Sequence, residues 1–172
     1  MKFFIYLTLP LAATLFFGCQ KSSPPAPTST APWEPTEAQP KLATMKIYLG
    51  AETLDTELAL NEKQIQTGMM FRTNIQDADS MLFLLPVPQR AYFWMKNCPE
   101  SISCAYITPD GIITEIHHLE KNDTNSVISA TDNIQFVLET SDGWFTRHHI
   151  GTGTVVRTEK GSLAETFLRS NQ

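Results

Sequence analysis

The sequence predicts a single compact α+β domain that is mostly β, with antiparallel strands and one main helix. Two observations support this fold class. Short apolar or alternating runs recur between turn-forming residues, which is typical of strands. Only one longer segment, 62–70, has apolar residues at helical spacing. The chain has 172 residues, enough for one domain, expected over 44–158, with an appendage at each end.

The predicted strands alternate with turns rich in glycine, proline and aspartate. Proline has no N–H to donate, so Pro86 and Pro88 should stop the strand that begins at Met81. The aromatic run 92–95 should be a largely buried strand. Its polar end either marks the exit of the strand into solvent or presents Lys96 and Asn97 at the mouth of a cleft. The predicted strands are 45–49, 53–60, 81–85, 92–95, 102–108, 112–119, 134–139 and 154–157.

The helix is expected to begin after Asn61, whose side chain can accept a hydrogen bond from the first helical turn. Ile65, Met69 and Met70 then fall on one face, which we expect to pack on the strands.

The first nineteen residues are typical of a secretion signal: Lys2 precedes an apolar run that ends at Gly18-Cys19. A cysteine at that position resembles the lipobox of bacterial lipoproteins. We therefore predict a lipidated Cys19 and a membrane-anchored protein of the bacterial cell envelope, facing the periplasm or the surface. Ordinary cleavage and an uncleaved anchor are the alternatives.

Residues 20–43 contain six of the eleven prolines and should form an extended tether, because they offer too little apolar surface to fold. Residues 159–172 are predicted to be a flexible tail. Between these appendages, residues 45–158 hold eight Lys and Arg against fourteen Asp and Glu, and 8 − 14 gives −6. Such an acidic domain is a poor nucleic-acid binder, so no nucleic-acid partner is predicted.

Several motifs follow one another in a recognisable order. They are Thr56-Glu57-Leu58-Ala59, Gly68-Met69-Met70-Phe71-Arg72, Met81-Leu82-Phe83, Phe93-Trp94-Met95-Lys96-Asn97, and Val137-Leu138-Glu139 with Gly143. In this order they resemble the domain of unknown function 192 family over about 45–157. The resemblance implies a compact β-rich domain, often exported and sometimes lipid-anchored, and it implies no activity. The chain departs from the family pattern at Cys98, Ser101 and Ser103, where the family has threonine, proline and aspartate.

The polar residues within these motifs, Arg72, Lys96, Asn97 and Glu139, are the candidate ligand-binding residues. Each follows an apolar element, and together they could form a cleft for an anion or a polar ligand. We expect Lys96 and Glu139 to share one cleft or network. In the structural alternative, Glu139 pairs with Arg72 or Lys96, and Asn97 binds a loop backbone.

The histidines and cysteines give two further predictions. Each histidine doublet, His117-His118 and His148-His149, has its rings on opposite faces of a strand, so no metal site and no cofactor is predicted. With Cys19 lipidated, Cys98 and Cys104 remain as a pair, and we predict a disulfide between them. Alternatively, Cys104 points into the core and Cys98 is a free thiol.

These observations favour a ligand- or partner-binding accessory domain over an enzyme. The partner would be an envelope protein or a small polar ligand, in addition to the membrane. A hydrolase-like activity on an envelope polymer, with Glu139 and either Lys96 or Arg72, is the main alternative. The missing family aspartate and the lack of a nucleophile–base pair argue against it. A purely structural envelope role is the third hypothesis, and the oligomeric state is not predicted.

Overall fold

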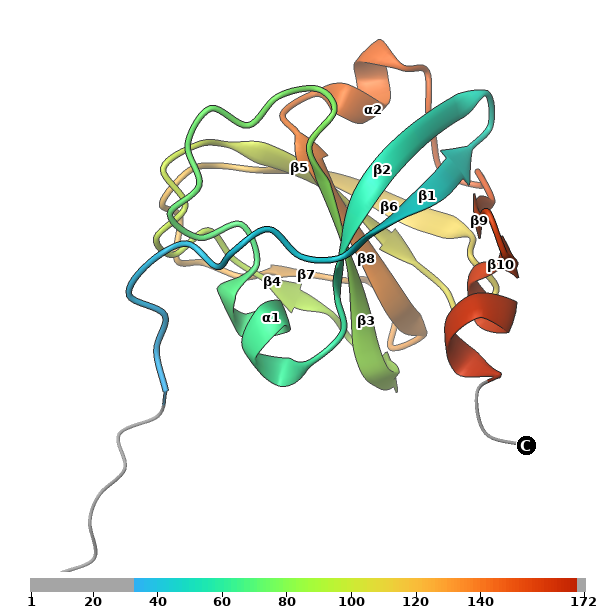
Figure 1. Cartoon of the computed structure of the whole chain (residues 1–172), viewed down its shortest axis with the longest axis horizontal. Coiled ribbons are helices and arrows are strands. Elements are labelled where there is room, and N and C mark those ends of the chain that lie inside the picture. The colour runs from blue at the N-terminus through green and yellow to red at the C-terminus, as the bar shows by residue number, and fades with distance from the viewer. Residues whose placement is uncertain (1–32, 170–172) are drawn as a thin grey trace, which may run out of the picture. The chain divides into compact units, whose positions relative to one another are not determined.

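The computed structural model describes residues 33–169, and from Glu34 onward they belong to one compact unit. The predicted signal peptide, Cys19 and residues 20–32 lie outside the described residues. The predicted fold class is confirmed: the unit is mostly β, and its main sheet curls into a half-barrel with short helices around it (Figure 1). No helix within the described part of the chain is long and apolar enough to span a membrane.

The main sheet has the strand order β10-β9-β1-β2-β3-β8-β5-β6, and β4 and β7 form a separate two-stranded sheet. The strands are β1 (Thr44–Leu49), β2 (Glu52–Ala59), β3 (Ser80–Gln89), β4 (Tyr92–Phe93), β5 (Ile102–Ile107), β6 (Ile113–Leu119), β7 (Val127–Ile128), β8 (Ile134–Ser141), β9 (Val156–Thr158) and β10 (Gly161–Ser162). The helices are α1 (Glu62–Thr67), α2 (Trp144–Arg147) and the π-helical turn η1 (Ala164–Leu168).

The predicted hairpins β1–β2 and β5–β6 are both present and antiparallel. In contrast, β2 pairs with β3 in parallel, a departure from the all-antiparallel prediction. A parallel pair needs a crossover connection, and α1 with the loop after it provides one.

Helix α1 begins as predicted. Asn61 and Gln64 form a capping box, in which each side chain bonds the other residue's backbone N–H. The helix ends earlier than expected, at Gly68, whose φ of 47° is left-handed. A Cβ there would lie 3.3 Å from the Phe83 ring, so this turn favours glycine.

Strand β3 continues through both prolines, contrary to prediction. Pro86 and Pro88 are exposed, and the pairing with β8 shifts between Leu84 and Gln89. Proline is tolerated at such an irregularity because no N–H is needed there.

The aromatic run 92–95 also differs from prediction, because only Tyr92 and Phe93 are in strand conformation and they pair with β7. Phe93 packs inward against the rings of Phe83 and Tyr106, at centroid distances of 5.1 and 6.1 Å. Tyr92 and Trp94 are exposed. The run is therefore a two-sided edge element and not a buried core strand.

Two hydrophobic cores form on the main sheet. The first, which we call the sulfur-rich core, contains Met69, Met70, Met81, Met95, Cys98 and Cys104 together with Ala59, Phe83, Leu85, Ala91, Ile102, Tyr106, Leu119, Ile134 and Val137. The second, the hydrocarbon core, consists of Ile47, Leu49, Leu54, Leu58, Leu82, Ala105, Ile107, Ile113, Phe136, Leu138, Trp144, Phe145, Val156 and Leu163. No buried member of the hydrocarbon core contains sulfur.

Within the described residues, parts of both predicted appendages pack on the domain. In the segment 34–43, the Gln39 amide donates to the Gly68 carbonyl at 2.9 Å, and Leu42 packs on the sulfur-rich core. At the other end, Leu163 is fully buried and Phe167 lies 5.9 Å from the Phe136 ring. Each segment folds because one or two apolar side chains reach a core, which composition alone does not reveal.

Candidate functional site

A row of side chains crosses the main sheet on the face of the sulfur-rich core. Strand register aligns Glu57 with Met81, Met81 with Glu139, Glu139 with Cys104, and Cys104 with His117. Cross-strand partners project to the same face, so Glu139 is flanked by a thioether and a thiol. The row places a carboxyl group in the middle of an apolar, sulfur-rich surface.

Glu139 is the unusual member of this row. It is 4% exposed, and its Oε2 is the one buried side-chain N or O atom within residues 33–169 that has no hydrogen-bond partner. Desolvation raises its pKa to about 8, although the charge of Arg72 acts in the opposite direction. Glu139 is therefore mostly protonated at neutral pH, and it can donate a hydrogen bond as well as accept one.

Arg72 lies close enough to act on Glu139, but its guanidinium is paired with Glu57. Nη1 and Nη2 donate to the two Glu57 oxygens at 2.6 and 2.9 Å, a bidentate geometry. Burial acts to raise the pKa of Glu57, but the bonds from Arg72 and from the Leu42 N–H outweigh it and lower that pKa. The two carboxyl groups therefore have pKa values displaced in opposite directions.

Two irregular segments, 68–72 and 95–98, contribute the methionines and Cys98 that pack around this row, and we call them the cap. The Phe71 N–H donates to the Asn97 carbonyl at 2.7 Å, which joins the two segments. Phe71 and Asn97 have φ values of 62° and 59°. A left-handed conformation is costly for a side chain as bulky as phenylalanine, and such strain concentrates at functional sites.

The four candidate residues are only partly brought together. Arg72 and Glu139 interact electrostatically, and Asn97 contributes its backbone carbonyl to the cap. Lys96 turns outward, where it pairs with Glu34 and lies 5.6 Å from the centroid of the Trp94 ring. The structural alternative, in which Glu139 pairs with Arg72 or Lys96, does not hold, because Arg72 pairs with Glu57 and Lys96 pairs with Glu34.

The predicted disulfide is absent from the structure, where Cys98 and Cys104 are both buried free thiols. The Cys98 thiol is directed at the Lys96 carbonyl, 3.6 Å away within its own turn, whereas Cys104 projects from β5 beside Tyr106. Burial, with a smaller contribution from Glu139, raises the pKa of Cys98 to about 12 and also raises that of Cys104. Neither thiol is an activated nucleophile.

The family comparison agrees with the motif order. The chain matches the model of DUF192, described as an uncharacterized ACR, over residues 45–158. It belongs to the DUF192 family. Two solved structures are similar to it. A putative transcription regulator from Sinorhizobium meliloti 1021 has a TM-score of 0.66 and 24% identity, over 70% of this chain and 98% of that one. A protein of unknown function from Novosphingobium aromaticivorans DSM 12444 has a TM-score of 0.64 and 26% identity, over 67% of this chain and 86% of that one. No match is found among curated proteins.

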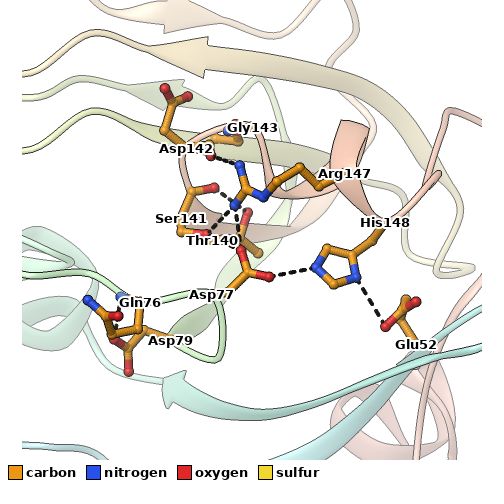
Figure 2. Close-up of polar contacts among 11 residues, drawn as sticks. Glu52, Gln76, Asp77, Asp79, Thr140, Ser141, Asp142, Gly143, Arg147 and His148 are labelled. Atoms are coloured by element: carbon orange, nitrogen blue, oxygen red, sulfur yellow. Dashed lines mark hydrogen bonds and ion pairs between the residues drawn. The ribbon is translucent and has the colours of Figure 1, made fainter.

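This DUF192 domain also contains a second polar cluster, which the sequence did not predict (Figure 2). The His148 Nε2 lies 2.8 Å from Asp77, and its Nδ1 lies 3.2 Å from Glu52. Arg147 contacts the same Asp77 at 2.5 Å, and Ser141 donates to it at 3.0 Å. The bonds from Arg147 and His148 lower the pKa of Asp77 to about 2. The cluster borders a pocket of about 330 Å³ that is also lined by Trp144.

The second cluster fastens the loop 72–79 of the DUF192 domain to α2 and to the start of β2. Glu100 fixes the middle of the same loop by accepting hydrogen bonds from the Asn74 and Ile75 N–H groups. The loop is thus held at residues 74–75 by Glu100 and at Asp77 by the cluster. These two contacts position Arg72 at the beginning of the loop. Four separate segments contribute to the cluster, so no local sequence motif could have indicated it.

His117 and His118 lie as predicted, on opposite faces of β6 and opposite Cys104 and Ser103 respectively. His148 and His149 do not lie on a strand as predicted, because His148 caps the C-terminus of α2 and His149 follows it. No group of three or more His, Cys, Asp or Glu side chains within residues 33–169 is arranged to hold a metal ion.

Proposed function

We propose that this protein is a membrane-tethered accessory domain of the bacterial envelope that binds a small polar ligand at Glu139 and Arg72. One observation supports the ligand site above all others: the unpartnered Oε2 of Glu139, buried at the centre of the sulfur-rich core. An unsatisfied buried polar atom costs roughly 1–3 kcal/mol, and a ligand that pairs with it recovers that cost.

The chemistry of the site indicates which ligand would fit. Protonated Glu139 offers one donor and one acceptor, and Arg72 has further N–H groups beyond the two that Glu57 accepts. A small uncharged ligand with a hydroxyl or amide group would satisfy both residues. An anion is a poorer fit, because Glu57 already neutralises Arg72.

Entry to the site would require the cap to move. The left-handed Phe71 stores strain that opening of the segments 68–72 and 95–98 could release. The methionines beneath them can adapt to a new shape because their side chains are unbranched and flexible.

Tethering rests on the lipobox-like position of Cys19. Two acyl chains contribute about 0.8 kcal/mol per buried methylene, which is sufficient for stable attachment. Replacing Cys19 with Ser should move the protein from the membrane fraction to the soluble envelope fraction. If Cys19→Ser protein still pellets with membranes and is released only by detergent, the apolar run 3–17 is itself the anchor.

A hydrolase-like enzyme acting on an envelope polymer is the second candidate, and one observation favours it. Glu57 and Glu139 have pKa values displaced in opposite directions beside a shared arginine, and such divergence marks acid and base pairs in active sites. In this mechanism, protonated Glu139 would be the general acid and ionised Glu57 would be the base.

One set of variants tests both candidates. Full-length wild type, Glu139→Gln and Asp110→Asn are purified from native membranes, and retained small molecules and proteins are identified by mass spectrometry. Asp110 is an exposed turn residue, so its variant is the matched control. We expect wild type and Asp110→Asn to retain a compound that Glu139→Gln loses. Identical profiles for all three would contradict a ligand at Glu139.

The enzyme candidate predicts a different result with the same proteins. Wild type and Asp110→Asn would release soluble fragments from isolated envelope polymer, and Glu139→Gln would not. A retained compound without fragment release supports binding alone.

A further inference from the structure

We propose that Tyr92, Trp94 and Ile128, which we call the aromatic patch, contact the surface of the bilayer to which the chain is tethered. This inference rests on the lipid anchor of the proposed function and adds an orientation to it. The ligand site does not use these side chains, although Trp94 belongs to one of the sequence motifs.

The patch is the outward face of the β4–β7 sheet. Tyr92 and Ile128 are cross-strand partners, and they are 59% and 48% exposed, while Trp94 just beyond β4 is 43% exposed. Phe93, between Tyr92 and Trp94, and Val127, next to Ile128, pack on the sulfur-rich core instead. Alternation along the strands thus leaves three large side chains in solvent, two of them aromatic with a polar atom at the ring edge.

The start of the described chain lies beside this patch. Glu34 pairs with Lys96, and the Lys96 ammonium lies 5.6 Å from the centroid of the Trp94 ring. Glu34 lies fifteen residue steps after Cys19, since 34 − 19 = 15, and a fully extended chain of that length spans at most about 50 Å. A lipidated Cys19 therefore keeps the face around Glu34 within reach of the bilayer.

Tethering makes a weak contact sufficient. The tether that the sequence predicts between Cys19 and Glu34 would hold its two ends at an effective concentration in the millimolar range. Trp and Tyr favour the membrane–water interface, where the ring is in an apolar layer and the polar atom is hydrated. A patch of two such side chains and Ile128 can thus orient the domain without being able to recruit it from solution.

The size and charge of the patch favour a bilayer over a protein partner. Its exposed area is on the order of 300 Å², whereas a stable protein interface buries about 800 Å² on each side. Lys96 is already paired and the domain is acidic, so charge attraction to anionic lipid is not the cause. Anionic lipid should therefore not strengthen the contact, and high salt should not abolish it.

The test uses the full-length lipidated protein in vesicles of phosphatidylethanolamine and brominated phosphatidylcholine, whose bromines quench tryptophan at the interface. A Trp33→Phe background leaves Trp94 and Trp144 as emitters, and Trp144 is 1% exposed. We expect bromolipid to quench the emission of Trp94. That emission is identified by its loss when Trp94→Phe is added to the Trp33→Phe background. Added phosphatidylglycerol should not increase the quenching, and the quenching should persist between about 0.1 and 1 M salt, where the Debye length falls from about 10 to 3 Å.

The matched control moves the reporter to another part of the main sheet. Tyr48 is an exposed aromatic residue on β1, which pairs with β2 and β9 and lies away from β4 and β7 (Figure 1). Tyr48→Trp, placed in the Trp33→Phe/Trp94→Phe background, should be quenched much less than Trp94. Equal quenching of both reporters would overturn a specific orientation.

Vesicle flotation separates failure of this inference from failure of the anchor. Protein that floats while Trp94 is not quenched overturns the aromatic patch and leaves the anchor intact. If Trp94 is then shielded in a dimer detected by sedimentation, the patch is a protein interface. Protein that does not float overturns the anchor and the orientation together.

Discussion

Leu138 and Glu139 are neighbours on β8, and they point into two cores of different character. Leu138 is surrounded by aliphatic and aromatic side chains, and elements on that side, including β1, β9 and α2, close the hydrocarbon core. Glu139 is placed among methionines and thiols beneath the irregular cap. One strand thus serves a core built for stability on one face and a core that tolerates a buried carboxyl group on the other.

The difference follows from what covers each face. Branched and aromatic side chains have few rotamers and pack into a single arrangement, so they suit a face closed by regular elements. Methionine fills irregular gaps because it has three rotatable bonds and a polarisable sulfur. A cap made of turns with left-handed residues offers an irregular surface, and the sulfur-rich core matches it. We infer that the cap side is where this domain can deform.

The largest predicted effect concerns Glu139 itself. Its pKa rises from the ordinary 4.5 to about 8 on folding, so the folded state disfavours the charged form. The destabilisation is absent below pH 4.5, grows between pH 4.5 and 8, and is complete above pH 8. Glu139→Gln should therefore match wild type near pH 4 and exceed its free energy of unfolding by on the order of 4 kcal/mol at pH 8.

Urea unfolding from pH 4 to 9 measures this difference, with Asp110→Asn as the control. A difference between Glu139→Gln and wild type that does not change with pH would show that Glu139 is not desolvated.

Leu138→Ala should produce the next largest effect, a loss of about 3 kcal/mol, from the transfer free energy and the cavity left in the hydrocarbon core. This loss should be the same at pH 5 and pH 8, because no titratable group is involved. Val87→Ala, an exposed change on β3, should cost less than about 0.5 kcal/mol. A pH-dependent loss for Leu138→Ala would mean that the two faces of β8 are coupled.

Arg72→Met should have a smaller effect, about 2 kcal/mol near pH 7. The change leaves the Glu57 carboxylate without its bidentate partner. The loss is smaller than for a fully buried pair because Arg72 keeps some solvent contact. The folded pKa of Glu57 is lowered, so this stabilisation is present above pH 4.5 and is lost as the pH falls below it.

Arg157→Met, at an exposed position on β9, is the control and should be near neutral. If Arg72→Met remained as destabilising at pH 3 as at pH 7, the loss would come from packing and not from the ion pair.

The smallest effect should be that of a reductant. Because Cys98 and Cys104 are free thiols in the structure, dithiothreitol should leave the free energy of unfolding of the Cys19→Ser protein unchanged. Thiol titration of the same protein, unfolded and unreduced, should find two reactive groups. Finding none would restore the disulfide predicted from the sequence.

Local patterns in the sequence predicted the β-rich fold, both hairpins, the start of α1 and the family. They failed where one contact between distant residues decided the outcome. Composition indicated that 34–43 would be an open tether, but Leu42 reaches the sulfur-rich core and its N–H bonds Glu57. The sequence predicts one shared cleft for Lys96 and Glu139 because each follows an apolar run. In the fold, Lys96 pairs with Glu34, and the Oε2 of Glu139 has no hydrogen-bond partner.

What the sequence determined by itself is what short-range physics decides: capping at Asn61, alternation along the strands, and turns at glycine and proline. Only the tertiary structure decided which face each strand presents to which core. It placed Glu139 between Met81 and Cys104, gave Arg72 to Glu57, and joined Asp77 to His148 across the domain. Strand register and loop packing set those pairings. Both depend on contacts between residues far apart in the chain, so no local pattern encodes them.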